Sequence, residues 1–362
     1  MKILFDYQIF FLQRYGGISN YFFNLIKEFN KKKIVNKVYA PLYINEYINN
    51  LKLDNKFGIN INLNFFKINY FLNKLFFSLF IKIYKPNIIH LTYYENNNFQ
   101  KKTKKYILTV YDMIHEEFSL NFKKNKTSIN KLNICNRVDH IITISKNTKK
   151  KLIEFFGINS KKITVVHLGG DHMKDIKPLK IEIKKKYILY VGSRAGYKNF
   201  ENLIKAYHLN EKIKKDYDII AFGGEKINSY EKNKYKKKFS NLDNIHFIQS
   251  NDRVLKFLYM NASLFVYPSL QEGFGIPPLE AIYNNCPVVC SNIPVLKEVL
   301  GNSCYYFNPN NIKNINYSLK KVLDSNHIRK RLIKSSNKVK KNFTWEKCAL
   351  KTLEVYQMVL KR

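Results

Sequence analysis

The segment LFVYPSLQEGFGIPPLEA, residues 264–281, predicts one strand, one loop and the start of one helix. Its first four residues are apolar and suit a buried strand, while Pro277 and Pro278 suit the first turn of a helix. Gly273 and Gly275 let the loop backbone approach a ligand closely, and the helix amides that follow form an anion site. A strand, a loop and a helix in this order form the repeating unit of a parallel α/β sheet.

The same unit recurs along the chain. Short β-branched or aromatic runs alternate with segments of helical period, such as 18–30 and 146–156. The expected strands are 2–6, 35–40, 87–91, 106–110, 140–144 and 163–167 in the first half, and 187–191, 218–222, 245–248, 264–267 and 288–290 in the second. This pattern predicts an α/β protein with two Rossmann-like doubly wound sheets in tandem.

A glycine- and charge-rich stretch of little periodicity, 168–186, separates the two halves. We therefore expect a first domain over 1–168 and a second domain over 169–344, with a last helix at about 345–362 that packs back on the first domain. Because open α/β sheets bind ligands beyond the carboxyl ends of their strands, we expect the ligand in a cleft between the domains.

Composition excludes several classes of protein. A hydrophobic fraction of 45% rules out a disordered chain, and no apolar run approaches the ~20 residues of a membrane span. Residues 1–6 lead directly into a strand, which predicts a cytoplasmic protein without a signal peptide. Five cysteines, an odd number in a large chain, are expected to be reduced core residues.

The net charge of +36 raises the possibility of nucleic-acid binding. The lysines are spread over every segment, however, which favours a compositional bias over one binding face, so no nucleic-acid partner is expected. Residues 65–85 combine aromatic and aliphatic side chains with lysines and contain no acidic residue. This segment is either the amphipathic cover of the first sheet or a helix that docks on an anionic membrane surface.

Charged residues cluster in two loops of the second half. Glu272 and Glu280 flank the glycine turn, with Glu280 expected on the first turn of the helix, and both can accept hydrogen bonds from a sugar nucleotide. Arg194 and Lys198 follow the first strand of the second half and suit a diphosphate, as a guanidinium fork and a point charge.

The pair Glu272-x7-Glu280, with Gly-Phe-Gly inside it, resembles the signature of the retaining family-four glycosyltransferases of GT-B fold. The resemblance implies two Rossmann-like domains that face each other across a cleft, an acceptor-side domain over 1–168 and a nucleotide-sugar-binding domain over 169–344. It also implies that Glu272 contacts the donor sugar, that Glu280 contacts the ribose, and that Arg194 and Lys198 neutralise the leaving diphosphate. The backbone amides that would face the sugar and the phosphates are those of Gly273, Phe274, Gly275 and Ile276.

Two segments of the first half extend this resemblance. Gly16 and Gly17 resemble the glycine loop that closes over the donor phosphate and the acceptor. Tyr111 and Asp112 occupy a position where many relatives have histidine directly before the aspartate. Tyrosine, with a pKa of about 10, is a poor base at neutral pH, so a proton relay is in doubt. His115 lies either near this site or in solvent.

Three further candidates are weaker. Ser145 resembles a family residue that faces the cleft, but an ordinary helix cap explains it equally well. His90 ends a strand and could line the acceptor side. Asp216 and Asp218 resemble a metal-binding D-x-D motif, which we reject because it precedes a strand and because Arg194 and Lys198 already supply positive charge.

Together these features predict a hexosyltransferase that needs no metal or other cofactor. By resemblance to bacterial polysaccharide mannosyltransferases, the expected donor is GDP-mannose, with UDP sugars next, and the expected acceptor is a glycan or a lipid-linked glycan of the cell surface. The chain would work in the cytoplasm or at the inner face of the plasma membrane. The alternatives are a GT-B epimerase or hydrolase of sugar nucleotides and a basic nucleic-acid-binding protein.

Overall fold

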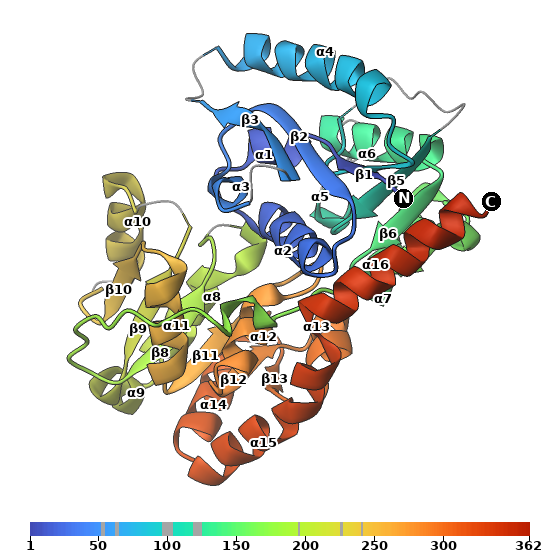
Figure 1. Ribbon diagram of the computed structural model, residues 1–362. Helices are drawn as coiled ribbons and strands as arrows, with labels where there is room; N and C mark the ends of the chain where they lie inside the picture. The colour runs from blue at the N-terminus through green and yellow to red at the C-terminus, as the bar shows by residue number, and fades with distance from the viewer. Residues whose placement is uncertain are drawn as a thin grey trace. The chain divides into compact units, whose positions relative to one another are not determined.

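A computed structural model of the chain describes residues 1–51, 55–61, 65–95, 104–118, 125–194, 196–224, 227–239 and 242–362. The chain forms two compact units (Figure 1). Unit 1 comprises Met1–Gly169 together with Trp345–Arg362, and unit 2 comprises Gly170–Thr344. This division lies one residue from the boundary expected between 168 and 169, and it places the last helix in unit 1.

Unit 1 is built on a parallel sheet with the strand order β3-β2-β1-β4-β5-β6-β7. The strand order changes direction beside β1, whose residue Ile3 pairs with Asn36 on one side and Ile88 on the other. The loops after β1 and β4 therefore flank a topological switch point, where such sheets bind ligands. The strands are β1 Ile3–Phe5, β2 Asn36–Tyr43, β3 Lys56–Asn60, β4 Ile88–Leu91, β5 Lys105–Val110, β6 His140–Thr143 and β7 Ile163–Val165.

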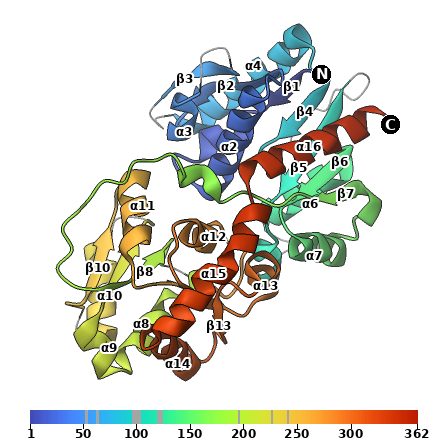
Figure 2. The same cartoon turned by 60° about the horizontal axis from the view of Figure 1, so that its bottom comes forward.

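Helices cover both faces of this sheet. On one face Phe5 packs against Phe22 of α2, and Phe29 of α2 packs against Tyr356 of α16, which lies beside α2 (Figure 2). On the other face α4 packs on β2. The helices are α1 Gln8–Leu12, α2 Gly17–Lys31, α3 Glu46–Asn49, α4 Phe66–Tyr84, α5 Ile114–Phe118, α6 Lys126–Arg137, α7 Lys146–Phe156 and α16 Trp345–Leu360, with a 3-10 turn η3 at Ser160–Lys162.

Unit 2 repeats the plan with the strand order β10-β9-β8-β11-β12-β13, all parallel. Its switch point lies between β8 and β11, where Leu189 pairs with Phe265. The two loops that carry the predicted donor residues leave these two strands. The strands are β8 Tyr187–Val191, β9 Asp218–Phe222, β10 Ile245–Ile248, β11 Leu264–Tyr267, β12 Val288–Ser291 and β13 Tyr305–Phe307.

The core of unit 2 forms because alternate residues of β8 point to opposite faces of the sheet. Ile188 and Tyr190 pack against Leu203 of α8 and Leu319 of α14, while on the other face Tyr259 of α11 packs against Phe265. The helices are α8 Phe200–His208, α9 Glu211–Asp216, α10 Ser229–Phe239, α11 Asp252–Asn261, α12 Ile276–Tyr283, α13 Pro294–Leu300, α14 Ile312–Leu323 and α15 Asn326–Asn342, with 3-10 turns η4 at Asp171–Met173 and η5 at Gly196–Lys198.

The predicted α/β class with two doubly wound sheets is confirmed, and all eleven predicted strands form within a few residues of the expected bounds. Two short strands, β3 and β13, were not predicted. All five cysteines are free and buried, as expected. Among the described residues, no helix combines the length and the apolar character that crossing a bilayer requires.

Candidate functional site

The loops after β8 and β11 bring Lys198 and Glu272 together. The Lys198 Nζ lies 2.7 Å from the Glu272 Oε1 and donates a second hydrogen bond, of 3.2 Å, to the Tyr267 hydroxyl. Burial alone would lower the pKa of Lys198, but Glu272 and two tyrosines beside the ammonium raise the pKa well above its usual value. Lys198 therefore stays charged at any physiological pH.

Arg194, on the same loop, is held by a residue that the sequence did not point to. Its Nε and Nη2 donate to the two carboxylate oxygens of Glu231 at 2.7 and 2.9 Å, and its Nη1 donates to the Gly223 carbonyl at 3.2 Å. The hydrogen bonds that Arg194 donates to Glu231 are the main reason why the pKa of Arg194 rises. An anion that binds Arg194 has to share the guanidinium with Glu231 or displace this carboxylate.

Glu280 lies on the second turn of α12, so its expected place on the first turn is wrong. Gly275, with a left-handed φ of 96°, caps the helix, so that Ile276 is the first helical residue. Both oxygens of Glu280 have partners: Oε2 accepts from the Tyr259 hydroxyl at 2.9 Å, and Oε1 lies 3.0 Å from the His172 Nε2. Neither partner was predicted, since His172 lies in the segment assigned to the linker.

The turn between the two glutamates depends on Gly275. A Cβ added at this residue would lie 2.6 Å from the Cδ2 of Leu296, and its backbone already has the left-handed φ that favours glycine. Phe274 is buried, and its ring contacts that of Phe343 at 5.9 Å between centroids. Phe274 can therefore serve a ligand only through its backbone, as the resemblance implies, and the same holds for Gly273.

In unit 1, Gly16 and Gly17 lie at the start of α2. Gly16 is the N-cap residue, and a Cβ there would lie 2.4 Å from the Gln13 Oε1, so any larger residue requires the end of the Gln13 side chain to move. The Ser19 hydroxyl donates to the Gly16 carbonyl at 3.0 Å. The first turn of this 15-residue helix has no acidic residue, which leaves the helix N-terminus suited to an anion.

Tyr111 and Asp112 follow β5, as predicted. The Tyr111 hydroxyl is buried and donates to the Thr92 carbonyl at 2.9 Å, and burial raises its pKa well above the usual value. Tyr111 is therefore unable to act as a base at neutral pH. Asp112 is half-buried, and its Oδ1 accepts from the amide of Ile114, the first residue of α5, at 3.1 Å.

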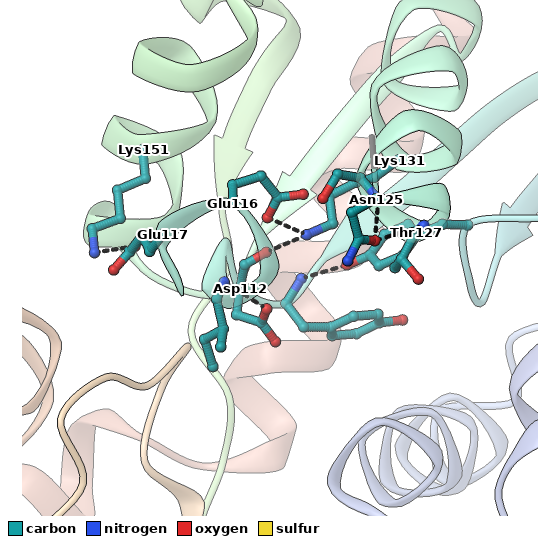
Figure 3. Close-up of polar contacts among 11 residues, drawn as sticks. Asp112, Glu116, Glu117, Asn125, Thr127, Lys131 and Lys151 are labelled. Carbon is teal, nitrogen blue, oxygen red and sulfur yellow. Dashed lines mark hydrogen bonds and ion pairs between the residues drawn. The ribbon is translucent and has the colours of Figure 1, made fainter. Parts of the chain in front are cut away.

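A buried ion pair fixes the position of Asp112 (Figure 3). The Lys131 Nζ donates to the Asp112 carbonyl at 3.0 Å and lies 2.8 Å from the Glu116 Oε2, and both side chains of the pair are 0% exposed. The ammonium also lies 5.1 Å from the centroid of the Tyr94 ring. Lys131 was missed because one lysine among 63 Lys and Arg residues gives no signal in the sequence.

The three remaining candidates, His115, Ser145 and His90, lie outside the loops after β8 and β11. His115 is exposed on α5, and Ser145 is the N-cap of α7, where its hydroxyl accepts from the Thr148 amide at 3.0 Å. The suggestion that His90 lines the acceptor side is wrong. Its ring is fully buried, its Nδ1 and Nε2 bond the hydroxyls of Tyr356 and Thr109 at 2.5 and 2.8 Å, and burial lowers its pKa to about 3.

The D-x-D motif has no metal-site geometry. Asp216 ends α9 and Asp218 begins β9, where Asp218 forms an ion pair with Lys185 at 2.9 Å and a hydrogen bond with His246 at 2.7 Å. Within the part of the chain that the structure describes, no three His, Cys, Asp or Glu side chains come together as metal ligands.

Two protein families match successive parts of this chain, and the matches meet near the junction between the units. Residues 15–173 match the family described as Glycosyltransferase Family 4, and residues 171–339 match that described as Glycosyl transferases group 1. The O-antigen chain mannosyltransferase RfbU of Salmonella typhimurium is 32% identical over 188 residues, which is 51% of this chain and 51% of that protein. The match thus spans about half the length of this relative.

Solved structures of similar fold cover nearly the whole chain. A glycosyltransferase from Rickettsia africae has a TM-score of 0.72 and 19% identity, with 100% of this chain and 99% of that one covered. Anabaena HepE, solved with UDP and glucose, has a TM-score of 0.74 and 12% identity, with 99% of both chains covered. These similarities establish the GT-B class of fold.

Proposed function

Because the chain belongs to the glycosyltransferases that join a family 4 domain to a group 1 domain, we propose that it transfers a hexose from a nucleoside diphosphate donor to a glycan or lipid-linked acceptor. The observation that carries this proposal is the arrangement at the β8/β11 switch point. Two cations, Arg194 and Lys198, and the carboxylate of Glu272 lie on the two loops that leave these strands, and Glu280 follows on the next helix.

We propose GDP-mannose as the donor, since RfbU is named as a mannosyltransferase of the O-antigen chain. By the same reasoning, the acceptor is a growing polysaccharide of the cell surface. A UDP sugar is the second candidate, because HepE binds UDP and has the same fold. Glu280 contacts the ribose in this proposal, and Glu272 contacts the sugar.

The proposed chemistry retains the configuration at the sugar and needs no covalent enzyme intermediate. As the glycosidic bond breaks, negative charge grows on the diphosphate, and Arg194, Lys198 and the amides near Gly275 stabilise this charge. The departing phosphate takes the proton of the acceptor hydroxyl on the same face of the sugar. Tyr111 takes no part in this proton transfer because its own hydroxyl is buried and stays protonated.

Thermal-shift measurements with GDP, UDP and their sugars test this proposal, because a ligand that binds only the folded state raises the melting temperature. We expect one nucleotide to shift the melting temperature and its sugar to be transferred when an acceptor is added. Free sugar released without transfer would favour a hydrolase, and an altered sugar nucleotide would favour an epimerase. Salt-sensitive binding to duplex DNA without any nucleotide effect would favour a nucleic-acid-binding protein.

We also propose that unit 1 docks on an anionic membrane, where a lipid-linked acceptor is presented. Helix α4 lies on the outer side of β2 and β3 (Figure 1). It is attached by Asn73, whose side chain exchanges two 2.9 Å hydrogen bonds with the backbone of Leu42, and by Phe77 and Ile81, which are buried. The helix thus covers the sheet with one stripe of residues.

The rest of α4 and its N-cap residue expose large apolar side chains. Ile83 is 78% exposed and Phe71 is 64% exposed, and neighbouring Phe57 and Ile59 of β3 are also exposed. The exposed apolar residues of this segment are Phe65, Phe66, Ile68, Phe71, Leu75, Phe76, Leu79 and Ile83. No acidic residue occurs between 55 and 94, while Lys67, Lys74, Lys82 and Lys85 accompany the apolar residues. Apolar insertion with lysines beside it suits an anionic bilayer.

Co-sedimentation with phosphatidylglycerol vesicles tests this surface. We expect the wild type to sediment with the vesicles at low salt and to sediment less at high salt. The double variant Phe71→Ser with Leu79→Ser should reduce sedimentation at least about fivefold, because binding is driven by the apolar area that is buried and by lysines that contribute about 1 kcal/mol each. Leu209→Ser with Tyr317→Ser, which changes exposed residues of unit 2, is the matched control. Equal sedimentation of both double variants would place the membrane contact elsewhere on the protein. A wild type that stays in the supernatant would refute the proposed membrane docking.

A further inference from the structure

His172 is a buried side chain in the segment with which unit 2 begins. It belongs to η4, and its side chain is only 7% exposed. The Nε2 atom lies 3.0 Å from the Glu280 Oε1. The other oxygen of Glu280 accepts from the Tyr259 hydroxyl at 2.9 Å, so two residues from different segments hold one carboxylate.

The segment that carries His172 is packed firmly against α12. A Cβ added at Gly170 would lie 2.4 Å from the Leu279 Cγ and 2.9 Å from the Tyr283 Cδ2, so the backbone touches α12 on both sides of Glu280. The Gly170 amide donates to the Phe343 carbonyl at 3.0 Å, and the Tyr283 hydroxyl donates to the same carbonyl at 3.0 Å. The distance between His172 and Glu280 is therefore fixed by the backbone and not only by two side chains.

The charges around His172 favour its role as a hydrogen-bond donor to Glu280. Burial lowers the pKa of His172, but the hydrogen bond to Glu280 and the charges of Glu280, Asp252 and Asp171 outweigh this effect and raise the pKa above its usual value. The imidazolium donates from Nε2, and the neutral ring does so as well in the tautomer that carries the proton there. His172 thus donates to Glu280 on both sides of its titration.

We infer that His172 is a positioning residue for the donor ribose, holding the Glu280 carboxylate in the orientation that accepts two ribose hydroxyls. This inference rests on the proposed role of Glu280 in donor binding. A carboxylate has about four lone-pair positions. His172 and Tyr259 occupy one position on each oxygen, which leaves one on each oxygen for the adjacent 2′ and 3′ hydroxyls.

Calorimetric titration of the full chain with GDP and 2′-deoxy-GDP tests this role, with UDP and 2′-deoxy-UDP used instead if UDP binds more tightly. We expect the wild type to prefer the ribonucleotide at least about tenfold, as for a hydrogen bond to a charged group. Glu280→Gln abolishes the preference. His172→Gln places an amide nitrogen where Nε2 was and keeps the preference, whereas His172→Asn places it near Nδ1 and reduces the preference to less than about threefold.

Other outcomes overturn the inference. His172 does not position Glu280 if His172→Asn keeps the wild-type preference for the ribonucleotide. The same holds if this variant weakens the binding of both nucleotides by the same factor. If Glu280→Gln loses the preference while both His172 variants keep it, the donor site stands and the inference about His172 fails. If the wild type binds no nucleotide, the proposed function fails first. Tyr259→Phe, which removes the other donor to Glu280, gives a second measurement should a His172 variant not fold.

Discussion

Lys198 and Glu272, which are 74 residues apart in the sequence, form an ion pair with a distance of 2.7 Å between Nζ and Oε1. They meet because β8 and β11 are adjacent in the sheet, so the loops that leave them converge. The family resemblance gives these residues different roles, one toward the diphosphate and one toward the sugar. Their contact makes the charge of one side chain part of the environment of the other.

A double-mutant cycle on Lys198 and Glu272 tests whether they act as a unit. We expect Lys198→Met and Glu272→Gln each to lower kcat/KM by at least about tenfold, because each leaves its partner without its counter-charge in a buried site. The double variant is expected to lose little more than the worse single variant. Strictly additive losses, measured in the same transfer assay, would show that the two side chains act independently.

Activity is expected to persist in excess EDTA. Arg194, Lys198 and the amides at the start of α12 supply the fixed positive charge that a divalent cation provides in metal-dependent transferases. The measurement is the initial rate before and after chelation, with manganese added back as the control. Complete loss of activity in EDTA, restored by manganese, would contradict this assignment and return attention to Asp216 and Asp218.

The buried pair of Lys131 and Glu116 is expected to be important for stability. Lys131→Met leaves Glu116 unpaired in the interior and should lower the free energy of unfolding by about 3–5 kcal/mol, as measured by urea denaturation. Lys131→Met with Glu116→Gln should cost less than the sum of the two single changes. The exposed pair of Lys351 and Glu354 is the matched control, and its loss should change stability by less than about 1 kcal/mol. A loss below about 1 kcal/mol for Lys131→Met would refute the assignment.

Asp6 is expected to make stability depend on pH. Burial raises its pKa from 3.8 to about 6, although the Thr92 amide at 2.9 Å and the Gln8 side chain at 2.7 Å donate to its oxygens. The folded state binds this proton more tightly than the unfolded state does. The resulting stabilisation is therefore complete below pH 3.8 and is lost as the pH rises through 6.

The measurement is the difference in unfolding free energy between the wild type and Asp6→Asn at pH 4 and pH 7.5. Other titrating groups largely cancel in this difference, so we expect the wild type to lose about 2 kcal/mol relative to the variant as the pH rises. A difference that is constant, or that changes in the opposite direction, would show that Asp6 does not titrate in this window.

The sequence was informative where one local pattern determines one element. The strand 264–267 and the turn after it were predicted correctly because apolar runs, glycines and prolines act locally. The edge strand β3 was not predicted, because its side chains are half-buried or exposed and its sequence therefore has no apolar run. The three-residue strand β13 is too short to give a pattern.

Partners at the site could not be predicted, because they come from distant segments. Glu231 binds Arg194 from 37 residues away, and Tyr259 reaches Glu280 from a different helix. His90 was misjudged for the same reason. Its position at a strand end suggested the acceptor side, but Tyr356 of α16, which is 266 residues away, covers its ring. The packing of α16, together with Phe5 and Phe22, around the ring shows that His90 is a core residue.

The most direct test of the central claim is the transfer of labelled mannose from GDP-mannose to a bacterial lipid-linked glycan, compared among the wild type, Arg194→Ala and Glu280→Ala. We predict that the wild type transfers mannose in step with GDP release. Each variant is expected to keep its fold and to transfer mannose at a rate at least about tenfold lower, because residues on such loops serve function rather than packing. Glu211→Ala and Arg331→Ala, which change exposed residues, are the matched controls. Transfer at the wild-type rate in Arg194→Ala and Glu280→Ala would contradict the donor site assigned to unit 2.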